Sequence, residues 1–229
     1  MMRKIKNHVI SAELLEKFKL FNTQFIQALI KLNEKSPEVA LKIAKQGWYL
    51  GLISHMGAPL ELNVFLENNQ LKELDEWMMD EVKGRMEWIE QSLLKRNPER
   101  RLLFQEAFDN HRKGRYFSSI ILLLSQVDGM CNERFGKSFF SIDRGTQKPV
   151  LKEPIEKIHL HDLNWMRIAF KSLTAINDKT SNSHKYPDFL NRHNILHGFD
   201  TKYGTEINSL KIISFLNCVN DMIYFDLEL

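Results

Sequence analysis

The sequence has few of the features that mark disulfide-stabilised or membrane-spanning proteins. Its 229 residues include two cysteines, ten glycines and six prolines. Cys131 and Cys218 each lie in an apolar helical pattern without a second cysteine at metal-binding or redox spacing, which indicates buried thiols. The longest apolar run, Ile120 to Leu124, is far too short to span a bilayer. We therefore expect a soluble protein with free thiols.

There is also no strong excess of either charge. Thirty-two basic and 29 acidic residues give a formal net charge of +3, which permits an anionic partner without requiring one. Hydrophobic residues make up 43% and charged residues 27%, as in ordinary folded domains. The basic start, Met1 to His8, precedes an amphipathic pattern rather than the apolar core of a secretion signal, so we expect a cytoplasmic location.

Long stretches of alternating apolar and polar residues, which predict strands, are absent. Apolar residues recur instead at spacings of three and four, which predicts an all-α helical bundle. The expected helices are a stripe from Leu14 to Leu32, a helix from Ser36 as N-cap to Gly47, one opening at Leu62 to Phe65, one over 71–93 interrupted at Gly84, a pair at Leu103 to Phe108 and Tyr116 to Arg134, one over Leu163 to Ile176, and a last amphipathic helix after Thr205.

Breaks in these patterns suggest how the chain is organised. Asn97-Pro98 marks a candidate border between an N-terminal helical region, residues 1–97, and a helical domain, residues 98–229. The helix that contains Ile120 to Leu124 is hydrophobic nearly all round there, so we expect it at the centre of the bundle. Gly136 to Pro154 is rich in turn-forming and polar residues and predicts a long loop.

Residues 187–198, Pro-Asp-Phe-Leu-Asn-Arg-His-Asn-Ile-Leu-His-Gly, concentrate groups that handle protons or phosphate. Asp188 fits an N-cap, and Gly198 fits a left-handed residue that ends a helix. A helix of about two and a half turns is therefore expected. On it, His193 and His197 lie one turn apart on the same face, with Arg192 at the edge of that face.

Such a cluster suits RNA cleavage without a metal. That reaction needs a base for the ribose 2'-OH, an acid for the leaving 5'-oxygen, and positive charge at the phosphorus centre. Imidazole titrates near neutrality, and guanidinium stays charged and offers forked donors to phosphate oxygens. The other interpretation is that His193 and His197 form a chance pair on an exposed turn.

A zinc site is a third interpretation, because histidines at i and i+4 can share a metal ion. The metalloprotease pattern requires Glu directly after the first histidine, and that position is Asn194, so the pattern is not met. His159 and His161 are further potential ligands, but nothing in their spacing requires a metal. We expect neither a metal nor a cofactor.

Asp128 follows the apolar run at a position that should be buried, and a buried carboxylate needs a partner. Arg192 is one candidate, because a carboxylate on the preceding helix would hold its guanidinium in a fixed pose. The alternative is a helix-end aspartate that faces solvent or binds backbone groups. The sequence leaves both open.

The string Leu-Asn-Arg-His-x-Ile-Leu-His-Gly resembles the Arg-x(4 to 6)-His motif of the HEPN superfamily. Those helical proteins are largely metal-independent ribonucleases of toxin and phage-defence systems. A second stretch, Tyr116 to Phe140, resembles the helix that precedes this motif in abortive-infection-like members. The resemblance covers roughly Asn97 to Leu229 and leaves the first ninety-odd residues outside it.

This resemblance implies roles for individual residues. His197 would transfer protons, Arg192 would clamp phosphate, and His193 and Asn194 would orient the substrate or the two main residues. Family members often place an acidic residue on the preceding helix, as Asp128 is here. Two such motifs meet across a homodimer in the family, since one Arg-His pair supplies only half of an acid-base arrangement.

Basic residues cluster outside the motif, most closely at Arg112, Lys113 and Arg115. They suit an RNA backbone, although solvated helix faces carry such residues at least as often. The aromatic residues of the N-terminal half are expected to be core residues rather than base-stacking platforms: Trp48, Tyr49, Trp77 and Trp88.

Taken with the resemblance, these patterns predict an endoribonuclease of a toxin-antitoxin or phage-defence system. Its expected partners are RNA, a second copy of the chain, and an antitoxin or defence-system protein. The alternative is a catalytically silent HEPN-like module that binds RNA or protein. Geometry separates the two, because an enzyme needs Arg192 and His197 of two chains at one open cleft.

Overall fold

A computed structural model of the chain describes residues 34–52, 54, 57–158, 164–179, 181–182 and 189–225. These residues form helices and loops without a strand, apart from an isolated β-bridge between Ile142 and Pro149, which confirms the all-α prediction. The expected stripe from Leu14 to Leu32 lies outside the described residues, as do His159, His161 and Asp188.

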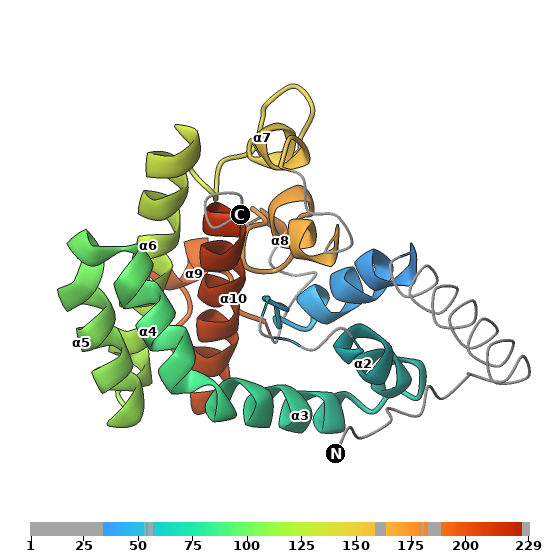
Figure 1. The fold of residues 1–229 in the computed structure, drawn as a ribbon, viewed down its shortest axis with the longest axis horizontal. Coiled ribbons are helices and arrows are strands. Elements are labelled where there is room, and N and C mark those ends of the chain that lie inside the picture. Colours follow the sequence, from blue (N-terminus) through green and yellow to red (C-terminus); the bar gives the residue numbers. More distant parts are fainter. Residues whose placement is uncertain are drawn as a thin grey trace, which may run out of the picture.

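From α2 to α6 the helices follow one another through short turns, whereas residues 136–151 form a long loop before α7 (Figure 1). Residues 34–45 are helical. The further elements are α2 (Ala58–Glu67), α3 (Leu71–Gly84), α4 (Met86–Arg96), a 3-10 turn (Pro98–Arg100), α5 (Arg101–Arg112), α6 (Tyr116–Phe135), α7 (Lys152–Glu156), a 3-10 turn (Asn164–Arg167), α8 (Ile168–Lys171), α9 (Arg192–Leu196) and α10 (Glu206–Tyr224). Of these described helices, none is long and apolar enough to cross a membrane.

Several predicted boundaries are confirmed. The long pattern over 71–93 is two helices that meet at Arg85, directly after Gly84. Gly47 follows the first helix with a φ of 87°, the left-handed conformation that glycine adopts at low cost. The hydroxyl of Thr205 accepts a hydrogen bond from the Asn208 amide at 3.3 Å and caps α10.

Two predicted helix starts are wrong. Residues 34 and 35 are already helical, so Ser36 is not the N-cap, and Pro37 lies within the helix. The next helix begins at Ala58 rather than near Leu62, with Pro59 in its first turn. Proline is tolerated in a first turn because its missing N–H would have no partner there. A proline in the sequence therefore indicates that a helix starts nearby, but it does not determine the first residue of that helix.

The helix predicted over Leu163 to Ile176 is much shorter than expected. It consists of the second 3-10 turn and α8, and the chain becomes extended at Ser172 (φ −120°, ψ 144°). Asn177 explains this ending. Its side-chain oxygen accepts from the Thr174 amide at 2.7 Å, and its nitrogen donates to the Ser172 carbonyl at 3.1 Å. These bonds give the backbone an alternative to continuing the helix.

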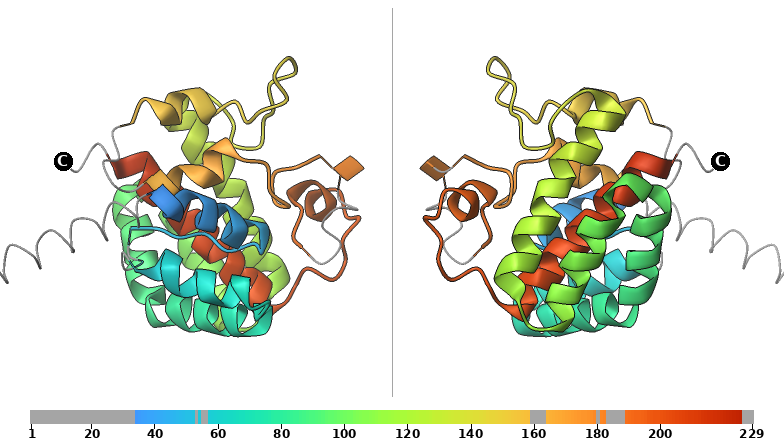
Figure 2. Two further views of the ribbon diagram at one scale, coloured as in Figure 1. Left: turned by 90° about the vertical axis from the view of Figure 1, so that its right-hand side faces the viewer. Right: turned by 90° about the vertical axis from the view of Figure 1, so that its left-hand side faces the viewer.

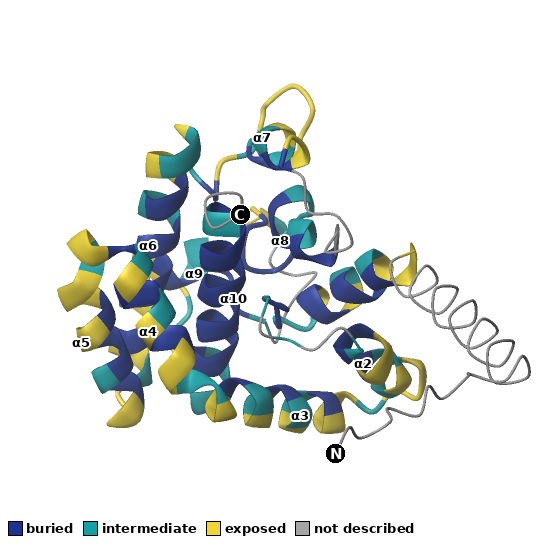
Figure 3. Cartoon of the chain, in the orientation of Figure 1, coloured by how far each residue is buried: buried dark blue, intermediate teal, exposed yellow. Residues whose placement is uncertain are grey.

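The central helix of the bundle is α10 rather than α6. Every residue from Ser209 to Ile223 is buried, and α10 packs against α3, α4, α6 and α8 (Figures 1 and 3). α6 buries one side only, since Phe117 and Ile121 are 49% and 38% exposed. The prediction that α6 lies at the centre of the bundle is therefore wrong, and α10 is not the amphipathic helix that its sequence pattern predicts. Cys131 on α6 and Cys218 on α10 are buried, as expected.

α10 tolerates burial on all sides because its polar side chains find partners. Asp221 accepts from Arg96 at 2.9 Å and from the Leu52 amide at 2.8 Å. Asn220 accepts from the side chain of Asn97 at 3.1 Å. Buried polar groups cost free energy unless they are paired, so these contacts make the central position of α10 possible.

The same contacts tie the two halves of the chain together. Asn97 is 1% exposed, and the Tyr224 hydroxyl donates to its side-chain oxygen at 3.0 Å. Residues before and after the candidate border at Asn97-Pro98 thus contribute to one hydrophobic core around α10. α9 lies at the edge of this bundle, where it packs against α6 (Figure 2).

Candidate functional site

α9 carries the predicted Arg-His cluster, but it starts later than expected. Its N-cap is Asn191, which has an extended backbone (φ −119°, ψ 121°) and accepts from the Asn194 amide at 3.1 Å. The side-chain nitrogen of Asn191, Nδ2, also donates to the carbonyls of Ala175 (2.8 Å) and Asp178 (3.0 Å). These three bonds fix the chain before Arg192, so α9 has five helical residues instead of two and a half turns.

The end of α9 matches the prediction. Gly198 has a φ of 74°, and its amide donates to the Ile195 carbonyl at 3.1 Å. The next amide, that of Phe199, donates to the Asn194 carbonyl at 2.8 Å. This pair of bonds is the Schellman motif, which needs a left-handed residue at the position of Gly198. The motif turns the chain sharply and leaves His197 at the surface.

Arg192 is held against α6. Its Nη2 atom lies 3.4 Å from Asp128 Oδ2, and its guanidinium carbon lies 4.9 Å from the centre of the Phe140 ring. The other oxygen of Asp128 accepts from the Ser138 hydroxyl at 2.6 Å and from the Phe140 amide at 3.2 Å. Both partners proposed for Asp128, Arg192 and backbone groups, are thus present.

The environment of Asp128 is more open than its sequence position predicts. Its side chain is 29% exposed and that of Arg192 is 25% exposed. The reason is that α6 lies beside α9 at the edge of the bundle instead of at its centre. The pair therefore remains accessible to a ligand.

The two histidines of α9 stack on each other. Their ring planes differ by 1°, and the ring centres of His193 and His197 are 6.0 Å apart. His193 is half-buried and His197 is exposed. The pKa of His193 is lowered, first by burial and then by the positive charges of Arg192 and His197, while Asp128 opposes the shift. His193 is therefore held toward its neutral form.

Two polar atoms of α9 retain hydrogen-bonding capacity. Arg192 Nε and Asn194 Oδ1 are buried and lack a hydrogen-bond partner among the described residues. Buried polar atoms without partners are uncommon in folded proteins and call for a specific explanation. Both atoms are enclosed by the protein, so neither is open to a ligand in this structure.

The predicted basic cluster lies elsewhere. Arg112 binds Glu90 through two nitrogens, at 2.7 and 3.4 Å, and Lys113 lies 2.7 Å from Asp109. Arg115 precedes the first residue of α6, thirteen positions before Asp128, which corresponds to about 20 Å along a helix. The structure does not bring these three residues to α9.

The four aromatic residues that were predicted to be core residues differ in how far they are buried. Trp48 and Tyr49 are buried core residues, 0% and 7% exposed, as expected. Trp77 packs against the core while partly exposed. Trp88 is 47% exposed, so the core prediction is wrong for this residue, because α4 turns it away from α10. No group of three potential metal ligands occurs within the part of the chain that the structure describes.

Neither Ser138 nor Phe140 is among the predicted site residues, although both lie in the stretch that resembles the family. Both come from the loop after α6 and reach Asp128 only because that loop folds back over the helix. Comparison of the chain with protein-family models, curated proteins and solved structures found no match. The site is therefore interpreted from its own geometry and from the motif resemblance.

Proposed function

We propose that the protein is a metal-independent endoribonuclease that cleaves RNA by attack of the ribose 2'-OH on the adjacent phosphorus. The observation that carries this proposal is the composition of α9 and its C-cap: an arginine anchored on a carboxylate, followed one and five positions later by two stacked histidines, the second of them at the surface. The proposal also rests on the resemblance to HEPN ribonucleases, which assigns the same residues.

In this reaction His197 transfers protons and Arg192 stabilises the charge that develops on the phosphate oxygens. Asp128 positions the guanidinium of Arg192. The lowered pKa of His193 favours a neutral ring that orients the substrate by accepting a hydrogen bond. Asn194, directly after His193, would orient the substrate or the two main residues, as the resemblance implies. The base and the acid must act on opposite sides of the phosphorus, so we place the second proton-transfer group on a second copy of the chain.

A two-fold dimer through α9 fits the surface around His197. Leu196 is 41% exposed and Phe199 is 71% exposed, and these apolar side chains flank the histidine. Burial of apolar area is the main favourable term in association. A self-complementary contact here would bring the two copies of His197 near each other. An antitoxin or defence-system protein is a further proposed partner, which would cover the same surface.

One observation favours a catalytically silent binding module. Arg192 contacts Asp128 and Phe140 on its own chain, so it serves the packing of α9 on α6 whether or not it meets phosphate. In that case the α9 surface would bind RNA or protein without chemistry. This second candidate predicts RNA binding without cleavage.

Total RNA incubated with the purified protein and EDTA tests the proposal. Because the acid, the base and the phosphate clamp are side chains, we expect cleavage to survive EDTA and to leave 2',3'-cyclic phosphate ends. Sequencing and end-group analysis of the products measure both. Strict dependence on zinc or magnesium, or 3'-hydroxyl products, would instead support metal-assisted hydrolysis.

A further inference from the structure

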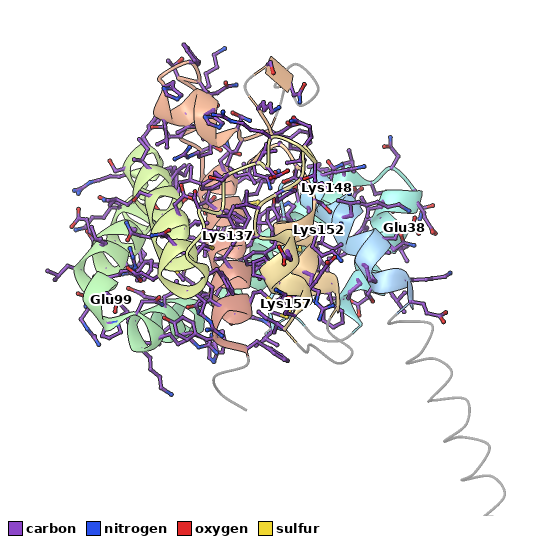
Figure 4. All side chains as sticks on the ribbon, turned by 90° about the horizontal axis from the view of Figure 1, so that it is seen from above. Glu38, Glu99, Lys137, Lys148, Lys152 and Lys157 are labelled. Atoms are coloured by element: carbon purple, nitrogen blue, oxygen red, sulfur yellow. The ribbon has the colours of Figure 1, made fainter. Side chains whose placement is uncertain are left out.

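The loop between α6 and α7, residues 136–151, forms one wall of a surface cavity of about 740 Å³. α7 forms the opposite wall, and the lining includes the side chains of three lysines, Lys137, Lys148 and Lys152. Figure 4 shows these three around α7, seen from above. We call this cavity the loop basin. Its volume lies in the range of ligand-binding pockets.

The carboxylates that line the loop basin already have partners. Glu153 lies 3.2 Å from Lys157, and Glu156 lies 3.0 Å from Lys171. Neither Lys157 nor Lys171 lines the basin. Each glutamate is therefore neutralised by a lysine from outside it.

The remaining carboxylate, Asp143, is held by its own turn. It accepts hydrogen bonds from the Thr146 amide and hydroxyl and from the Gly145 amide, and the first of these is the main reason that its pKa is lowered. It therefore carries one negative charge, turned toward the loop backbone.

The lysines of the basin are not matched in this way. Among the described residues, no carboxylate lies within 4.0 Å of the ammonium groups of Lys137, Lys148 or Lys152. Lys137 donates to the Val150 carbonyl, at 3.5 Å. Three positive charges thus face one negative charge, and the basin has a local excess of two.

Two chains of contacts connect the loop basin to α9. At the base of the loop, Ser138 lines the basin while its hydroxyl donates to Asp128, which binds Arg192. Near the tip, Gln147 accepts from the ammonium group of Lys179. The residue before Lys179, Asp178, accepts at its carbonyl from the α9 N-cap. Ser138 is therefore shared by the basin and by the carboxylate that binds Arg192, and Gln147 ties the loop to the segment that anchors the N-cap of α9.

We propose that the loop basin binds the phosphate backbone of a single RNA strand whose next phosphate lies at Arg192. This inference rests on the proposed function, because it takes RNA as the substrate at α9. Lysines bind phosphate as mobile point charges without base specificity. The basin accordingly sets affinity and strand position, and it leaves the chemistry to α9.

The experiment measures binding without cleavage. The probe is a short fluorescein-labelled oligoribonucleotide with 2'-O-methyl groups, which 2'-OH attack cannot cut, and the readout is fluorescence anisotropy. The test protein carries Lys137→Gln, Lys148→Gln and Lys152→Gln. The control protein carries Lys45→Gln, Lys72→Gln and Lys95→Gln, three exposed lysines on other helices, so both proteins lose the same charge.

We expect the basin substitutions to weaken binding by about tenfold or more and the control substitutions to change it far less. Each phosphate contact contributes about 0.7 to the slope of log K against log salt for a single strand. The slope should therefore fall by about 2 in the basin variant. If that variant melts early, Lys148→Gln alone serves, because Lys148 is exposed.

Three results would overturn the inference: equal binding by wild type and basin variant, equal weakening by both triple variants, or lysine-dependent binding of adenosine monophosphate that the oligonucleotide does not displace. The last would assign the basin to a free nucleotide. Failure of the proposed function is a different result, since a wild-type protein that binds the methylated strand through the basin but cleaves no RNA refutes only the chemistry.

Discussion

α10 and α9 both carry clusters of polar side chains, but the two clusters differ in burial. On α10, Asp221 is 0% exposed and its carboxylate is paired with Arg96. On α9, Arg192 is a quarter exposed and His197 lies at the surface. The polar groups of α10 are enclosed by the bundle, whereas those of α9 remain open to a ligand.

The local chain explains this difference. α10 has nineteen residues and is surrounded by other helices, so its polar side chains are desolvated and need internal partners. α9 has five helical residues between an asparagine cap and a Schellman turn, and it covers only the side of α6. We infer that the first cluster stabilises the fold and that the second is available for function. Each prediction below tests this division.

The largest effect is expected from His197→Ala. Loss of a general acid or base lowers the rate of a reaction by about 100- to 10,000-fold, and an exposed side chain contributes little packing. RNA cleavage should therefore collapse while the melting temperature stays near that of wild type. Cleavage assays and thermal melts on the same preparation measure both. Full activity in a normally folded variant would remove His197 from the mechanism.

Asp221→Ala should have the opposite signature, a loss of stability. Removing one partner of a buried ion pair costs about 3 to 5 kcal/mol, and Asp221 also accepts from the Leu52 amide, which loses its partner. Urea unfolding should show this decrease in the free energy of unfolding. Glu76→Ala is the matched control, because its ion pair with Lys72 is exposed. Similar losses in the two variants would contradict the assigned role of α10.

Asp128→Asn tests whether the carboxylate that holds Arg192 contributes to stability or to the positioning of Arg192. Asparagine retains an oxygen for the Ser138 hydroxyl and the Phe140 amide but loses the charge that faces Arg192. A partly exposed ion pair contributes about 1 kcal/mol or less, so stability should change little. Cleavage should fall by less than in His197→Ala, because Arg192 remains but is less well positioned. A rate equal to wild type would show that Asp128 has no positioning role.

Much of the fold is predictable from the sequence because helix periodicity and turn glycines are local signals. The α3–α4 break at Gly84 and the left-handed Gly198 are both expected from the sequence and are present. The cap of α9 was misassigned because Asn191 receives its anchoring contacts from Ala175 and Asp178, which are distant in sequence.

The central helix was misassigned for a related reason. Polar residues such as Asn217 and Asp221 make α10 appear amphipathic, and only contacts with distant segments, such as Arg96 and Leu52, allow their burial. The candidate site, too, could be predicted only in part, because some of its contacts come from distant segments. Its α9 residues follow from a motif, whereas Ser138 reaches Asp128 only through the path of the loop after α6.

The smallest expected effect is on the pH dependence of stability. His111 is 7% exposed and lies 2.8 Å from the Ser209 hydroxyl. Its pKa is lowered mainly by burial, with Glu206 opposing the shift and Lys83 and Arg112 adding to it. The unfolded chain, with a histidine pKa of about 6.5, therefore binds this proton more readily than the folded protein does.

Folding stability should thus decrease as the pH falls through about 6.5, with a slope of at most about 1.4 kcal/mol per pH unit for one proton. His111→Asn, which retains a nitrogen near the Ser209 hydroxyl, should flatten this slope in urea unfolding between neutral and mildly acidic pH. His193→Asn should flatten it less, because the His193 ring on α9 is less buried. A larger change in slope from His193→Asn would mean that His193 on α9, rather than His111 at the contact between α5 and α10, has the more strongly desolvated imidazole.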